Sequence, residues 1–313
     1  MANYKILVSD GLDEQGLERL RQGGEVNYQP QISPASLLQE IGAYDALVVR
    51  SRTKVTAPVI QAGRRLRVIG RAGVGVDNID LAAASAAGVI VVNSPLAATL
   101  AVAELTVALI LALARQLPAL DASMKVGKWE KSAYLGSEVN GKTLGILGLG
   151  RIGSQVARYA SALGMRVMAF EPYRGENEIR QEGVEAADYD EILANADYLS
   201  LHLPLSAETR GLLGAAEFAK MKPGIRLINT ARGGIVDEDA LRAALDSGQV
   251  AGAALDVFSA EPVKSGSIAS HPKVIATPHI AAQTTEAQLR AGMAIAEEVL
   301  AALQGQPLRW RVT

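Results

Sequence analysis

Short apolar runs alternate with longer amphipathic stretches along most of the chain. In the first hundred residues the strand-like runs are YKILVS (4–9), ALVVR (46–50), RVIGRAG (67–73) and VIVVN (89–93). In one intervening helix, Ser33 caps the start, Pro34 fits the first turn and Gly42 marks the stop. This alternation predicts a series of βα units with a parallel sheet.

A second series of the same kind begins after residue 140. Its strand-like runs are LGIL (144–147), RVMAF (166–170), DYLSLHL (197–203), IRLINTA (225–231), AGAALDVF (251–258) and VIATP (274–278). Between the two series lies the apolar stretch 97–115, which approaches the length of a membrane span. Glu104 interrupts that stretch and no second span accompanies it, so we expect a buried helix that a subunit interface could cover.

The last helical stretch, 285–305, most simply returns to the first series. We therefore expect residues 96–278 to form one domain inserted into another, which is built from residues 1–95 and 279–313. The crossings near Pro95 and Pro278 are expected to act as hinges beside a cleft.

Composition narrows the choice of partner and compartment. The chain has 313 residues, enough for two domains, and its 31 Lys and Arg against 33 Asp and Glu give a net charge of -2. No strong field favours nucleic acid or membrane, so a small metabolite is the expected partner. The sequence contains no cysteine, and its N-terminus lacks the pattern of a signal peptide. Both features lead us to expect a cytoplasmic protein.

The second series opens with a dinucleotide-binding pattern. Gly148, Gly150 and Gly153 form G-x-G-x-x-G directly after an apolar run and at the start of a helix. The first glycine permits a tight turn, the second lets the backbone approach a pyrophosphate, and the third lets helix and strand pack closely. Glu171 ends the next strand, where an acidic side chain binds the ribose hydroxyls and repels a 2′-phosphate. We therefore expect NAD rather than NADP.

Polar residues follow three later strands of this series. Arg232, Glu261 and His279 each come after a predicted strand, so they are expected at one edge of the sheet. An arginine can hold a carboxylate, a histidine can transfer a proton, and a glutamate can fix the histidine. Taken alone, His279 could also be a packed ring. We expect His202 to shape the site and His271 to be an exposed loop residue.

The chain resembles the D-isomer-specific 2-hydroxyacid dehydrogenases from about Val48 onward. The motifs that carry the resemblance are GRAGVGVDNIDL (70–81), GKTLGILGLGRIG (141–153), NTARGGIVDEDAL (229–241), GAALDVFSAEP (252–262) and TPHIAAQT (277–284). The resemblance implies a Rossmann nucleotide-binding domain inserted into a flavodoxin-like substrate-binding domain, both doubly wound α/β structures. It also implies that Arg232, Glu261 and His279 are catalytic, with His279 as acid and base.

The resemblance further implies ligand contacts and a two-fold dimer built on the nucleotide-binding domain. The cofactor contacts expected for NAD are Val74, Gly148, Gly150, Arg151, Ile152, Gly153, Glu171, Leu203, Thr230, Ala231, Arg232, Asp256, His279, Ala281 and Ala282. Substrate contacts are expected at Arg50, Arg71, Gly73, Val74 and Lys131, with the amides of Gly73 and Val74 directed at the substrate carboxylate. No metal is expected.

The similarity is strongest to members that oxidise 3-phosphoglycerate. Arg50, Arg71 and a Lys131 from the neighbouring subunit would surround the phosphate, although a surface salt bridge would also explain Arg50. Two alternatives stay open: reduction of glyoxylate, hydroxypyruvate or another small 2-oxo acid, and an NAD-sensing co-repressor without turnover. Ala97, Ala98 and Val74 depart from common family residues, and the chain is expected to be a short form without C-terminal regulatory domains.

Overall fold

The structure is a computed structural model that describes residues 4–313, and it contains two compact units. Unit 1 comprises Met1–Thr99 and Ala282–Thr313, and unit 2 is the intervening Leu100–Ala281. One unit is thus inserted into the other along the chain. The division falls a few residues beyond Pro95 and Pro278.

Unit 1 is built on a parallel sheet with the strand order β2-β1-β3-β4-β5. Its strands are β1 (Tyr4–Val8), β2 (Gly24–Tyr28), β3 (Ala46–Val49), β4 (Val68–Arg71) and β5 (Ile90–Asn93). This is the flavodoxin-like order of a doubly wound sheet, as expected. The edge strand β2 was not predicted, because its sequence, GEVNY, lacks an apolar run.

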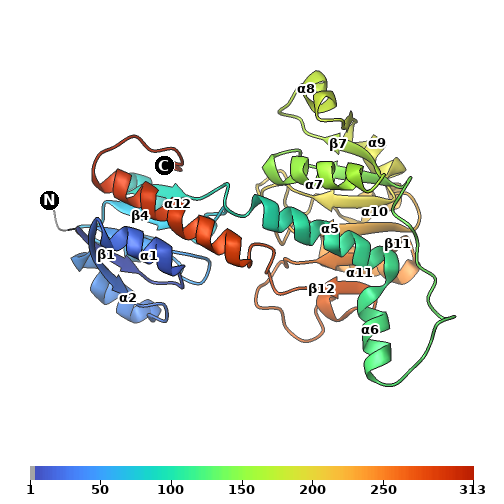
Figure 1. Cartoon of the computed structure of the whole chain (residues 1–313), viewed down its shortest axis with the longest axis horizontal. Coiled ribbons are helices and arrows are strands. Elements are labelled where there is room, and N and C mark those ends of the chain that lie inside the picture. The colour runs from blue at the N-terminus through green and yellow to red at the C-terminus, as the bar shows by residue number, and fades with distance from the viewer. Residues whose placement is uncertain (1–3) are drawn as a thin grey trace. The chain divides into compact units, whose positions relative to one another are not determined.

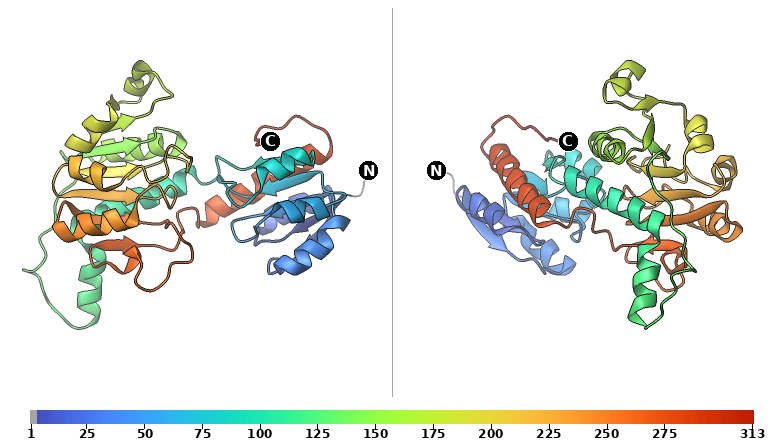
Figure 2. Two further views of the ribbon diagram at one scale, coloured as in Figure 1. Left: turned by 180° about the vertical axis from the view of Figure 1, so that it is seen from behind. Right: turned by 45° about the vertical axis from the view of Figure 1, so that its right-hand side comes forward.

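Helices cover both faces of this sheet. They are α1 (Glu14–Arg21), α2 (Pro34–Glu40), the 3₁₀ turn η1 (Ile41–Ala43), α3 (Ala57–Ala62), α4 (Leu81–Ala86) and α12 (Thr285–Leu303). Figures 1 and 2 show α1 and α12 side by side against the sheet. Because side chains alternate along a strand, Ile6 and Val8 pack toward α1 and α12, whereas Leu7 packs in the cluster of α2 and α3. The cap at Ser33 is confirmed.

Unit 2 contains the second parallel sheet, with the order β12-β11-β10-β9-β6-β7-β8. The strands are β6 (Thr143–Leu147), β7 (Arg166–Phe170), β8 (Glu185–Ala186), β9 (Tyr198–Leu201), β10 (Ile225–Asn229), β11 (Val250–Leu255) and β12 (Val274–Ala276). Counted from β6, this is the Rossmann order with one further strand at the β12 edge. The order reverses between β6 and β9, which is where such sheets bind their ligands.

The helices of unit 2 also lie on both faces of its sheet. They are α5 (Thr99–Arg115), α6 (Leu117–Lys125), α7 (Arg151–Ala162), α8 (Glu176–Gln181), α9 (Tyr189–Asn195), α10 (Ala215–Lys220), α11 (Glu238–Ser247) and the 3₁₀ turn η2 (Ile268–Ser270). Residues of α5 and α7 share one apolar cluster, and residues of α9, α10 and α11 share the other. Figure 1 shows α5 lying across its face of the sheet.

The apolar stretch 97–115 forms the expected helix, α5, and a second helix, α6, follows it directly. The chain breaks at Gln116, whose φ is 54°, and α6 leaves α5 at 66°. Among residues 4–313, no helix alone is long and apolar enough to cross a membrane, although the bent pair of α5 and α6 has sufficient length and composition. Along α5, Ala103, Leu109 and Ile110 are buried within unit 2.

Candidate functional site

The glycine turn between β6 and α7 has the shape that a dinucleotide requires. Gly148 has φ 96°, and a Cβ there would lie 2.7 Å from the carbonyl oxygen of His202. A Cβ on Gly153 would lie 2.1 Å from the carbonyl oxygen of Gly148, so helix and turn pack at backbone distance. A Cβ on Gly150, the N-cap of α7, would lie in open space. The turn therefore fits a pyrophosphate at the helix N-terminus.

Glu171 follows β7 and is fixed beside this turn. Its Oε2 accepts a hydrogen bond from the amide of Leu149 at 3.0 Å, and its Oε1 accepts one from Tyr173 at 3.2 Å. Leu149 lies between Gly148 and Gly150, so the carboxylate is next to the expected pyrophosphate position. A carboxylate after this strand is the ribose ligand of NAD sites, and this role stays a prediction for Glu171.

The turn that carries Arg232 is shaped by Asn229, the last residue of β10. The Asn229 side chain accepts from the amide of Ala231 at 3.0 Å and donates to the carbonyl of Arg232 at 2.9 Å. A Cβ on Gly233 would lie 1.8 Å from the carbonyl oxygen of Phe258, so this turn is packed directly against the loop that follows β11. The sequence analysis missed Asn229, which is buried, although an asparagine directly after a strand-like run is a recognisable turn signal.

His279 and Glu261 form an acid–base pair. The Nδ1 of His279 lies 2.8 Å from Oε2 of Glu261, while Oε1 of that carboxylate accepts from the amide of Phe258 at 3.0 Å. Because an ionised carboxylate only accepts hydrogen bonds, this contact is a hydrogen bond in the tautomer that carries its proton on Nδ1. The other nitrogen, Nε2, is therefore the one that can exchange a proton with a ligand. The His279 side chain is 48% exposed, so it is not the packed ring that a lone histidine could have been.

Asp256 organises the loop that carries His279. The Asp256 side chain is fully buried, and it accepts hydrogen bonds from Thr277 Oγ1 at 2.6 Å and from the amides of Ile280 and Ala281 at 2.8 and 2.9 Å. Its carbonyl accepts from the amide of His279 at 2.9 Å. These bonds hold His279 at φ 53°, a left-handed conformation that a non-glycine residue rarely adopts.

The other two histidines have separate environments. His202 follows β9, and its Nε2 lies 2.9 Å from Ser200 Oγ. Burial lowers the pKa of His202 to about 4, so the ring is neutral at physiological pH and does not serve as a proton donor there. The prediction for His271 was wrong: it is buried, its Nδ1 accepts from the amide of Lys273, and its Nε2 lies 3.2 Å from Asp246.

In unit 1, the residues after β4 form a loop held by the end of β5. The amide of Gly73 donates to Ser94 Oγ at 2.6 Å, and the Gly73 carbonyl accepts from the Ser94 amide. Asn93 donates to the carbonyl of Val74 at 2.7 Å. The Gly73 amide is thus used within the loop, which corrects our expectation that it is directed at a substrate. Arg71, the last residue of β4, is half-buried at the start of this loop.

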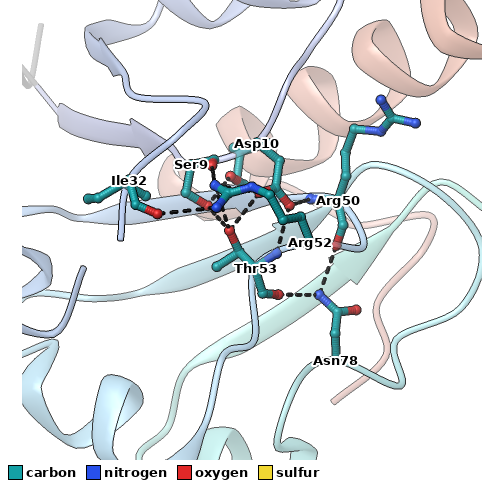
Figure 3. A network of polar contacts seen from close by, with 8 residues as sticks. Ser9, Asp10, Ile32, Arg50, Arg52, Thr53 and Asn78 are labelled. Atoms are coloured by element: carbon teal, nitrogen blue, oxygen red, sulfur yellow. Dashed lines mark hydrogen bonds and ion pairs between the residues drawn. The ribbon is translucent and has the colours of Figure 1, made fainter. Parts of the chain in front are cut away.

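Arg50 follows β3 in a turn that is clamped from two sides (Figure 3). The buried carboxylate of Asp10 accepts from the Arg50 amide at 2.6 Å and from the Thr53 amide and hydroxyl at 3.2 and 2.6 Å, and it pairs with Arg52 at 3.1 Å. Asn78 donates to the carbonyls of Arg50 and Thr53 at 2.8 and 2.7 Å.

This clamp fixes the backbone of Arg50 and leaves its side chain to extend away from Asp10, as Figure 3 shows. The guanidinium donates to Gln283 Oε1 at 3.2 Å. Burial lowers the pKa of Arg50, against an opposing attraction from Asp10. The turn follows β3, which is the neighbour of β1 in the sheet. The strand order reverses between these two strands, and doubly wound sheets bind ligands at such a point. The arrangement suits an anion.

The remaining predicted residues lie at helix starts, after strands, or on an exposed segment. Arg151 and Ile152 begin α7, and Leu203 follows β9. Thr230 and Ala231 follow β10, and Thr230 Oγ1 lies 2.8 Å from Thr106 Oγ1 of α5. Ala281 and Ala282 follow His279 in the chain. Lys131 is exposed in the segment after α6, and its expected role in a neighbouring subunit stays a prediction.

Together the glycine turn, Glu171 and the Glu261–His279 pair define a dinucleotide-binding protein with acid–base groups at the strand ends. The family model described as "D-isomer specific 2-hydroxyacid dehydrogenase, NAD binding domain" matches residues 107–281. The chain belongs to the D-isomer specific 2-hydroxyacid dehydrogenase family. The NAD cofactor and the two-domain α/β fold expected from the sequence are both confirmed.

Curated relatives are similar to nearly the whole chain. The chain is 47% identical over 307 residues to D-3-phosphoglycerate dehydrogenase of Archaeoglobus fulgidus, covering 97% of this chain and 58% of the relative. It is 47% identical over 305 residues to the enzyme of the same name from Bacillus subtilis, again covering 97% of this chain and 58% of the relative. The chain thus spans a little more than half the length of these relatives.

Solved structures of similar length share the whole fold. The TT0316 protein of Thermus thermophilus has a TM-score of 0.90 at 36% identity, with 99% of this chain and 100% of that chain covered. A glyoxylate reductase from Paecilomyes thermophila has a TM-score of 0.91 at 32% identity, with 100% and 99% covered. The names of these relatives therefore include both of the enzyme activities that the sequence analysis left open.

Proposed function

We propose that the protein oxidises D-3-phosphoglycerate to 3-phosphohydroxypyruvate with NAD, the first step of phosphorylated serine biosynthesis. The 2.8 Å contact between His279 and Glu261 carries this proposal, because it prepares a base at the strand ends of an NAD-binding domain. The identity to relatives named D-3-phosphoglycerate dehydrogenase supports the phosphorylated substrate over an unphosphorylated one.

In this proposal, His279, Glu261 and Arg232 are the catalytic residues. Neutral His279 accepts the hydroxyl proton of the substrate at Nε2, and Glu261 stabilises the imidazolium that forms. NAD, when bound, supplies the hydride acceptor. Arg232 binds the carboxylate and the oxygen that becomes the carbonyl, which orients the substrate and stabilises developing negative charge. In the reverse direction, the imidazolium of His279 returns the proton.

The proposed cofactor contacts are the residues at the turns and strand ends of unit 2, together with Val74. Gly148, Gly150 and Gly153 would hold the pyrophosphate, and Glu171 would accept from the ribose hydroxyls. For the substrate, Arg71 and the Val74 amide would bind the carboxylate, while Arg50 would bind the phosphate. Burial of Arg50 supports this last contact, because a partly desolvated cation gains more from an anion than an exposed one does.

We further propose a homodimer in the cytoplasm. The support for a dimer is a group of exposed apolar side chains on α6 and the segment after it, namely Leu117, Met124, Val126, Trp129 and Leu135. Side chains of this size gathered on one segment indicate a protein interface. In such a dimer, Lys131 would reach the phosphate bound to the other copy.

The test is a panel of D-2-hydroxy acids and 2-oxo acids with NADH absorbance as the readout, using the unaltered protein and His279→Asn. Asparagine tolerates the left-handed backbone at this position, so the variant isolates the loss of the proton acceptor. We expect turnover to fall by about 10² or more with NADH binding retained. Near-full activity of the variant would refute the role of His279.

The panel also separates the alternatives. A preference for glyoxylate or hydroxypyruvate over 3-phosphohydroxypyruvate would assign the protein to the small 2-oxo acid reductases, an activity named for one solved structure of similar fold. NADH binding without turnover of any acid would favour a cofactor-sensing protein. Under our proposal, Arg50→Ala raises KM for the phosphorylated substrate about tenfold and leaves hydroxypyruvate nearly unchanged.

A further inference from the structure

Two side chains of the loop that follows β7 form hydrogen bonds with the centre of the glycine turn. Glu171 Oε2 accepts from the amide of Leu149 at 3.0 Å, and Arg174 Nη1 donates to the carbonyl of Leu149 at 2.9 Å. Both backbone polar groups of the residue between Gly148 and Gly150 are thus bonded to this loop. Arg174 therefore lies in the immediate surroundings of the ribose ligand Glu171.

The guanidinium of Arg174 is also surrounded by carboxylates of α8 and its C-terminal end. Its Nε donates to Glu178 Oε1 at 3.0 Å, and its Nη2 donates to Glu182 Oε1 at 2.6 Å. Each of its nitrogens is thereby engaged, and the side chain is only 20% exposed. The hydrogen bond with Glu182 has the largest effect and raises the pKa of Arg174, burial opposes it, and the hydrogen bond with Glu178 raises the pKa further. One guanidinium thus pairs with two carboxylates.

A cation at this place has a known use in dinucleotide sites. Where NADP is bound, an arginine near the end of the second strand accommodates the 2′-phosphate, and where NAD is bound an acidic side chain takes the ribose hydroxyl. Here both types of residue follow the same strand, because Glu171 and Arg174 are three positions apart. The arginine would serve a 2′-phosphate if its charge were available.

We propose that Arg174 is a cofactor-specificity residue whose charge Glu178 and Glu182 cancel while they hold it on the Leu149 carbonyl. Preference for NAD over NADP then rests on the Glu178–Glu182 pair as well as on Glu171. Removing the negative charge of the pair exposes a cation to the 2′-phosphate and removes two repelling groups. Glutamine at both positions keeps an oxygen that can accept from Arg174, so the loop keeps its hydrogen bonds.

The experiment measures binding of NADH and NADPH by nicotinamide fluorescence, without any substrate. We expect Glu178→Gln with Glu182→Gln to lower the dissociation constant for NADPH about tenfold and to change that for NADH less than about twofold. The matched control is Glu176→Gln, which removes a carboxylate from the same helix where it pairs with Arg180 at 2.9 Å. This control should leave the ratio of the two constants unchanged. Thermal denaturation checks that each variant is folded.

Adding Arg174→Gln to the double variant decides whether the gain comes from the arginine. We expect the tighter NADPH binding to be lost again. The proposal is overturned if the double variant keeps the original NADPH to NADH ratio, if Glu176→Gln produces the same gain, or if the gain persists without Arg174. Glu182→Gln alone is a milder variant that should show part of the gain if the double variant does not fold. Because binding requires no turnover, the outcome is independent of the proposed substrate.

Discussion

Asp10 offers a test of how the fold places Arg50, because unit 1 contains a second buried aspartate with a similar environment. Asp45 is 8% exposed against 3% for Asp10, accepts from the amide of Lys5 at 2.9 Å and pairs with Arg65 at 3.0 Å. Asp10 instead clamps the turn of Arg50. Asp10→Asn and Asp45→Asn therefore remove the same charge from similarly buried positions, and only the first disturbs the proposed phosphate contact.

The size of the effect follows from the bonds at each aspartate. An asparagine at position 10 replaces one carboxylate oxygen with an NH₂ group, which is a donor. In one orientation this group meets the amides of Arg50 and Thr53, and in the other it meets the Thr53 hydroxyl and Arg52. Part of the clamp is lost in both orientations. Each hydrogen bond to a charged group is worth about 1.5 to 3 kcal/mol, so both variants should lose a few kcal/mol of unfolding free energy. A displaced Arg50 should also raise KM for 3-phosphohydroxypyruvate about tenfold, the equivalent of about 1.4 kcal/mol.

The assay compares KM and kcat for 3-phosphohydroxypyruvate and hydroxypyruvate, followed by NADH absorbance, alongside urea denaturation of both variants. Asp10→Asn should lose affinity for the phosphorylated acid alone, whereas Asp45→Asn should lose stability without a change in selectivity. An equal change on both substrates in Asp10→Asn would refute the role of the clamp. The same conclusion follows if Asp45→Asn shows the selective loss.

Other features of unit 2 lead to further predictions. Asp256→Ala leaves the buried Ala281 amide without its acceptor and frees the loop of His279. Urea denaturation should show a loss of at least about 2 kcal/mol in unfolding free energy, and kcat should fall by a factor of about 10². A retained kcat would contradict this prediction. Burial lowers the pKa of His202 from 6.5 to about 4. Between pH 6.5 and about 4 the unfolded chain therefore binds more protons than the folded one, so the unfolding free energy falls by up to about 3 kcal/mol as the pH drops through this range. His202→Asn should flatten this loss in denaturation curves measured at successive pH values, and an unchanged slope would exclude His202 as its source. Light scattering at micromolar concentration should give twice the mass of the chain, and Trp129→Glu should shift the mass toward one chain if the exposed segment is the interface.

Apolar patterning was sufficient to predict most of the fold. Every strand-like run that we identified forms a strand, because buried parallel strands have continuous apolar sequences. The two missed strands, β2 (Gly24–Tyr28) and β8 (Glu185–Ala186), lie at sheet edges, where one side is solvated and an apolar run is not required. The helix α6 after Gln116 was also missed, since a left-handed glutamine has no local sequence signal comparable to that of glycine.

The candidate site was predictable where a motif places a side chain at a strand end, as for His279 and Glu261. It was not predictable where the structure depends on pairing between distant segments. The bond from Gly73 to Ser94 and the one from Arg174 to Leu149 each join a side chain to the backbone of another loop. Such bonds follow from the three-dimensional course of the chain, and no spacing within the sequence indicates them.

The left-handed backbone at position 279 limits which residues can replace the histidine. Asparagine and glycine adopt this conformation at little cost, whereas β-branched side chains there are conformational outliers. A population of random variants at this codon should therefore contain few that are both inactive and fully folded, with asparagine and glycine prominent among them. Those variants are the suitable starting material for trapping a bound substrate, since they remove the proton acceptor without changing the loop that presents it.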